Sequence, residues 1–211
     1  VGMHSRLMAW LEERGSIVRD QEHLPSDEEL RERAEQGKGL TSPEFAVLVA
    51  ATKLALKEER GDSDLAQDPW FEAPLAEYFP EPLRERFADR IAEHPLRREI
   101  VTTAVANSMV NRGGISFVHR LVTETGASMP RVARAFVVVR EIFGMRDFVE
   151  AVEGLDNVVP TDVQCDLYLS FRRLVDRATR WFLQNRPARL DIGAEIARFG
   201  PAVAELWPLM G

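Results

Sequence analysis

Apolar residues recur at spacings of three and four along most of the 211-residue chain. This is the pattern of helices that each bury one face. It predicts helices over 27–36, 42–56, 72–78, 83–92, 96–111, 115–125, 130–143, 147–152, 161–185 and 192–200, with a final helix from 201. The stretch 135–143 is rich in valine, but its flanking spacing favours a helix over a strand.

Capping residues place the ends of several of these helices. Ser26 and Glu29 have the spacing of a capping box, and Ser42 before Pro43 reads as an N-cap and first-turn pair. Asp191 is a candidate N-cap, while the pair Gly200-Pro201 predicts that one helix stops and another begins.

The longest helix, over 161–185, carries one narrow stripe that we expect to face the core. Its members are Val163, Leu167, Ser170, Leu174, Ala178 and Trp181. A helix of this length spans about 37 Å at 1.5 Å per residue. The fold class predicted is therefore all-α: a multi-helix bundle with one long central helix and no dinucleotide-binding sheet.

The chain divides by composition into three parts. Residues 1–61 form an N-terminal helical segment, 62–81 a loop-rich linker and 82–211 a helical bundle, which we expect to pack with the first segment as one unit. Four of the twelve prolines fall between Gly61 and Leu83, which is typical of a segment broken into turns.

Composition and charge limit the function classes. The formal net charge of −7 argues against nucleic-acid binding, and no apolar run reaches the roughly 20 residues of a membrane span. Cys165 is the only cysteine, so we expect a reducing, cytoplasmic location. Because the chain starts at Val1, we also expect it to be a piece of a longer protein.

Motifs for catalysis or cofactor binding are missing from the sequence. It has no Gly-x-Gly-x-x-Gly, no Gly-x-Ser-x-Gly, and no pair of histidines at a metal-binding spacing among His4, His23, His94 and His119. Cys165 has no histidine near it in sequence, so we interpret it as a packed thiol. We predict no catalytic, cofactor or metal site in this chain.

The stretch "RREIVTTAVANSMVNRGG" (97–114) is the best candidate for a polar site. Its helix is apolar nearly all round, so its asparagines must be hydrogen-bonded or cost about 1 to 3 kcal/mol each. We favour a buried polar network in which Asn107 and Asn111 tie neighbouring helices together. The alternative is that Asn107, Asn111, Arg112 and His119 line a pocket or an interface.

Arginines cluster on the long helix at positions 172, 173, 177 and 180. They could bind phosphate, a nucleic acid or a partner. Because Asp166 and Asp176 lie among them, a solvated, ion-paired face is the better interpretation.

Several ordered blocks resemble the C-terminal helical region of the large NAD-specific glutamate dehydrogenases. They are "LPSDEEL" (24–30), "GLTSPEFAVLVAATK" (39–53), "SDL" (63–65), "YFPEPLRERF" (78–87), "HPLRREI" (94–100), "NSMVNRGGISFVHRL" (107–121), "LDNVVP" (155–160) and "RATRWFLQNR" (177–186). Together they extend over nearly the whole chain.

The resemblance implies that the intact polypeptide converts L-glutamate and NAD to 2-oxoglutarate, ammonia and NADH. In this family a lysine and an aspartate act as acid and base beside a dinucleotide-binding domain. Only Lys38, Lys53 and Lys57 occur here, none in a glycine-rich catalytic context, so no catalytic residue is carried over. We expect the fragment to be inactive and without cofactor, with NAD bound elsewhere in the full-length enzyme.

Two interpretations of the region's role follow. In the first, it is a structural, oligomerising or regulatory module that packs on the upstream catalytic domain of a homo-oligomeric enzyme. In the second, it is a stand-alone helical protein-interaction or scaffold module without enzymatic activity.

Overall fold

The computed structural model describes residues 2–61 and 64–206, and every regular element in that part of the chain is a helix. The all-α prediction is confirmed. The elements are α1 (Gly2–Glu13), α2 (Asp27–Glu35), α3 (Ser42–Gly61), η1 (Asp64–Gln67), η2 (Pro69–Phe71), α4 (Glu72–Glu77), α5 (Glu81–Arg84), α6 (Ala88–Ala92), α7 (Arg97–Ser108), η3 (Met109–Gly113), α8 (Phe117–Thr125), α9 (Met129–Ile142), α10 (Met145–Glu153), α11 (Thr161–Asn185) and α12 (Ile192–Leu206). Residues 62–63 of the expected linker and 207–211 of the expected final helix lie outside the described residues.

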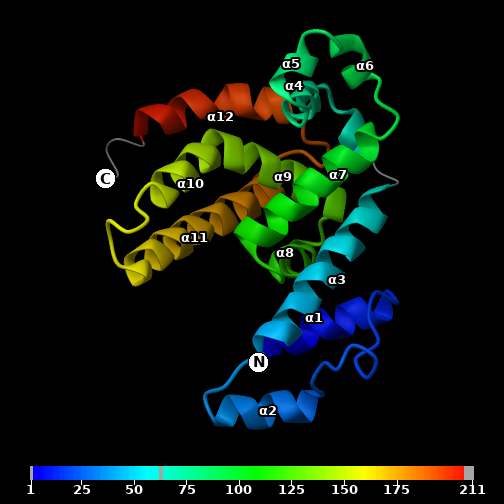
Figure 1. The fold of residues 1–211 in the computed structure, drawn as a ribbon, viewed down its shortest axis with the longest axis vertical. Helices are drawn as coiled ribbons and strands as arrows, with labels where there is room; N and C mark the ends of the chain where they lie inside the picture. The colour runs from blue at the N-terminus through cyan, green and yellow to red at the C-terminus, as the bar shows by residue number, and fades with distance from the viewer. Residues whose placement is uncertain (1, 62–63, 207–211) are drawn as a thin grey trace.

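Helix α9 lies at the centre of the bundle. Every residue from Val132 to Val139 is buried, and α3, α8, α10, α11 and α12 all contact this helix. Figure 1 shows α12 along one side of α9 and α11 along the other, with α1 and α2 at the far end of the molecule. The valine-rich stretch is helical because neighbouring helices cover all its faces, which outweighs its β-propensity.

The long helix α11 has the predicted bounds, but its core-facing stripe was predicted wrongly. The buried residues are Phe171, Val175, Thr179, Phe182 and Leu183. The predicted stripe lies beside this face, and at its two ends Val163 and Trp181 are 43% and 45% exposed. Helix α11 therefore carries two apolar stripes, of which the core takes one.

The predicted helix ends hold at some positions and fail at others. The capping box is present, because Ser26 accepts from the Glu29 N–H at 3.2 Å and its own N–H donates to the Glu29 carboxylate at 2.8 Å. Ser42 was predicted as the N-cap of α3, but it is the first residue of that helix, and Thr41 takes the capping position. The Thr41 N–H donates to the Glu44 carboxylate at 2.7 Å.

Helix α12 runs without a break through Gly200 and Pro201, so the predicted stop there was wrong. Its face with Ile192, Ile196 and Phe199 belongs to the core cluster. Helical stability comes mainly from such packing, which here offsets the unfavourable glycine and proline.

A buried arginine on α9 fixes the segment that precedes α4. Arg134 is 8% exposed and forms ion pairs with Asp68 and, at 3.0 Å, with Asp64. It also donates to the Leu190 carbonyl at 3.3 Å, and it holds the pKa of Asp64 below its ordinary value. The predicted linker is thus anchored to the core, and its described part forms η1, η2 and α4.

We predict that Arg134→Ala lowers the free energy of unfolding by about 3 kcal/mol, because removal of one buried partner leaves the Asp68 carboxylate uncompensated. Urea denaturation measures this. The matched control is Arg146→Ala, whose side chain is 78% exposed and whose loss should change stability by less than about 0.5 kcal/mol. Equal effects of the two substitutions would contradict this role for Arg134.

Candidate functional site

A groove of about 700 Å³ lies between α4, the C-terminal end of α7 and α10. Its lining residues are Trp70, Ala73, Pro74, Glu77, Ser108, Arg112, Arg140, Glu141, Gly144, Met145, Arg146, Asp147 and Val149. Arg112 was a candidate from the sequence, whereas the other charged residues were missed. No sequence pattern links these other charged residues, because they come from three separate elements, α4, α9 and α10.

A π-helical turn carries Arg112 into this groove. The turn, η3, continues α7 and is followed by Gly114, which has φ of +94°. Wider turns of this kind are frequent at functional sites. Gly113 is required by close packing, since a Cβ there would lie 2.6 Å from the ring of Phe117, which is 1% exposed.

The groove is balanced in charge. Arg140 pairs with Glu141 at 2.7 Å and lies over the Trp70 ring at 5.6 Å. Arg146 pairs with Glu77 at 2.8 Å, which raises the pKa of the guanidinium. Three arginines and three acidic residues thus line it, so its chemistry suits a protein surface of mixed charge better than a phosphate group.

The four predicted site residues do not gather at one place. Asn107 is half-buried and Asn111 is exposed, while Arg112 lines the groove. His119, on α8, packs its ring against Trp10 of α1 at 5.5 Å. Of the four, Arg112 lines the groove, and a role for these residues in an interface or a buried polar network stays a prediction.

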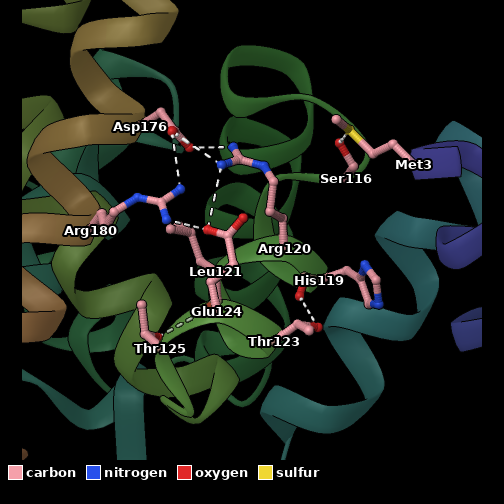
Figure 2. Close-up of polar contacts among 10 residues, drawn as sticks. All are labelled: Met3, Ser116, His119, Arg120, Leu121, Thr123, Glu124, Thr125, Asp176 and Arg180. Carbon is pink, nitrogen blue, oxygen red and sulfur yellow. Dashed lines mark hydrogen bonds and ion pairs between the residues drawn. The ribbon is translucent and has the colours of Figure 1, made fainter.

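An ion-pair network joins α8 to α11 (Figure 2). Arg120 pairs with Asp176, Arg180 pairs with Glu124, and weaker contacts of 3.9 and 3.6 Å complete the set. The His119 ring points away from this network, on the other side of α8. The predicted ion-paired face of α11 is thus present at Arg180.

Residues 2–61 and 64–206 hold no group of three or more histidine, cysteine, aspartate or glutamate side chains arranged to bind a metal ion. Within the same residues, no helix has the length and apolarity needed to cross a membrane.

Comparison with known proteins identifies the family. The family model described as glutamate dehydrogenase, C-terminal, matches residues 37–211. The chain belongs to this family. Three proteins named NAD-specific glutamate dehydrogenase are 44% (Pseudomonas aeruginosa), 41% (Halomonas elongata) and 40% (Mycobacterium tuberculosis) identical to it.

The matches cover 98%, 100% and 99% of the chain but only 13% of each relative. The resemblance read from the sequence blocks is therefore confirmed.

We predict that Gly113→Ala lowers the free energy of unfolding by about 2 kcal/mol, because the added methyl meets a buried ring that has little room to move. Thermal and urea denaturation measure the change. Gly200→Ala is the control: nothing lies within 4 Å of its Cβ position inside α12, so alanine should stabilise the helix by up to about 1 kcal/mol. Changes of the same sign would contradict the close-packing role of Gly113.

A second prediction concerns pH. Burial, and then the charges of Arg14 and Arg6, lower the pKa of His119 from its ordinary 6.5. A lowered pKa means that protonation favours the unfolded chain, so stability is complete above about pH 6.5 and falls as pH drops below it. We expect His119→Phe to reduce the loss of stability between pH 7 and 5.

Some carboxylates also have lowered pKa values, among them Asp27, Glu29 and Glu44. Their contribution to stability is lost mainly below pH 4, which is about the pKa of these groups in the unfolded chain. They therefore interfere little in this window. Burial also lowers the pKa of His4, so the His4→Phe variant is measured in parallel with His119→Phe. An unchanged slope in His119→Phe would show that the Trp10 contact does not depend on the neutral ring.

Proposed function

We propose that this chain is a non-catalytic helical region of an NAD-dependent glutamate dehydrogenase. The intact enzyme would convert L-glutamate and NAD to 2-oxoglutarate, ammonia and NADH. The observation that carries the proposal is that three NAD-specific glutamate dehydrogenases match the chain almost end to end over 13% of their own length.

The proposed role is to pack against the upstream catalytic part of the same polypeptide or against another subunit. The groove supports this role, because its balanced charges suit a protein surface. Large apolar side chains left exposed support it as well, among them Phe45, Leu54, Tyr78, Leu96 and Val158. Exposed apolar groups of this kind are suited to burial against another surface.

Further parts of the proposal rest on the sequence. The chain has no Gly-x-Gly-x-x-Gly segment and no lysine in the glycine-rich catalytic context of the family, so NAD binding and acid–base catalysis belong to other parts of the enzyme. A homo-oligomer in the cytoplasm is the assembly and location that we propose for it.

The test is glutamate-dependent NAD reduction by the full-length protein, with the 211-residue fragment assayed beside it. We expect activity only in the full-length protein, and no micromolar affinity of the fragment for NADH by fluorescence titration. Activity in neither would favour a scaffold module without enzymatic activity. Turnover by the fragment would overturn the non-catalytic role.

A further inference from the structure

The second apolar stripe of α11 is a surface that the described residues leave largely uncovered. Val163 and Leu167 are 43% and 36% exposed, and Trp181, near the other end of the helix, is 45% exposed. At 100° per residue the three side chains lie within about 40° of one another. Ser170 and Leu174 lie between them on the same face, so the stripe is continuous for about 27 Å.

Two other faces of α11 pack against neighbouring helices. Phe171 stacks on Phe148 of α10 at 4.1 Å, and Asp176 pairs with Arg120 of α8. On the stripe itself, Trp181 touches Phe199 of α12 at 5.7 Å. The open part therefore runs from the N-terminal end of α11 toward that contact.

The charges beside the stripe are divided between the two halves of the helix. Asp162 and Asp166 precede Ser170, whereas Arg173 and Arg177 follow it. Asp166 and Arg177 lie within about 20° of each other on the helix surface, at the edge of the stripe away from Phe171. They are about 16 Å apart along the axis, so they cannot pair within one helix.

Reversing the helix direction brings these charges together. In an antiparallel pair of α11 helices centred near residue 172, Ser170 faces Leu174 of the second copy and Asp166 lies beside Arg177 of the second copy. A two-fold axis makes each contact twice. The antiparallel arrangement also sets the positive end of each helix dipole beside the negative end of the other.

We propose that the stripe Val163–Leu167–Ser170–Leu174–Trp181 is a two-fold interface, on which α11 of a second copy of this chain packs antiparallel. The small Ser170 opposite Leu174 lets the helices approach closely at the centre. This inference deepens the proposed function, because it names the surface through which subunits of the glutamate dehydrogenase associate.

The test uses the full-length enzyme and two charge reversals, Asp166→Arg and Arg177→Asp. Each single variant sets like charges together at two places in the dimer, so its dissociation constant should rise about tenfold. The double variant restores opposite charges between copies and should return to within about threefold of wild type. Mass photometry over a dilution series measures association.

A second variant tests the apolar part. Leu167→Asp should weaken association at least as much as the single charge reversals, because it sets a carboxylate in the apolar contact. Leu83→Asp, at a 40% exposed position on α5, is the matched control and should leave the mass distribution unchanged. Circular dichroism melts of every variant confirm that the fold is kept.

Three outcomes overturn the inference. Failure of the double variant to restore association would exclude the antiparallel register. An unchanged mass with a lowered melting temperature in Leu167→Asp would show that another part of the same polypeptide covers the stripe. If neither the mass nor the melting temperature of Leu167→Asp changed, the stripe would be a free surface. Glutamate-dependent NAD reduction, measured on the same samples, reports on the proposed function separately.

Discussion

The burial of the Arg134 guanidinium is the constraint on which the centre of the fold depends. A charged group in the most buried helix is stable only if carboxylates and carbonyls satisfy it. Asp68 and Asp64 come from the segment before α4, and the Leu190 carbonyl comes from the segment before α12. One side chain on α9 therefore fixes two connections that are more than a hundred residues apart in the sequence.

Other arginines use the same chemistry. Arg131 donates to the carbonyls of Leu183 and Arg186, both at 2.9 Å, and so holds the C-terminal end of α11 against α9. Arg97 reaches the Ala66 carbonyl at 2.9 Å. Carbonyls at helix ends and in turns lack partners within their own element, and a long guanidinium can reach them from a neighbouring helix. Here arginine side chains satisfy these carbonyls from a neighbouring element.

The sequence predicts what depends on local spacing and fails where neighbouring helices decide. The bounds of α11 and the capping box of Ser26 follow from nearby residues, so both could be predicted. Which stripe of α11 faces the core depends on where α9 and α10 lie, and two apolar stripes on one helix cannot be ranked by spacing alone. The groove around Arg112 was missed for the same reason, because its lining comes from segments that only the fold brings together.

The groove and the second stripe of α11 differ in chemistry and share no residue. The groove sets arginines among carboxylates, whereas the centre of the stripe is apolar and only its edge is charged. A surface that pairs with itself must match its own pattern under a two-fold axis, and the acidic and basic halves of α11 meet this condition. The groove has no such internal symmetry, because its charges come from unrelated elements. On the proposals above, the stripe joins like subunits, and the groove is left to contact a different surface of the enzyme.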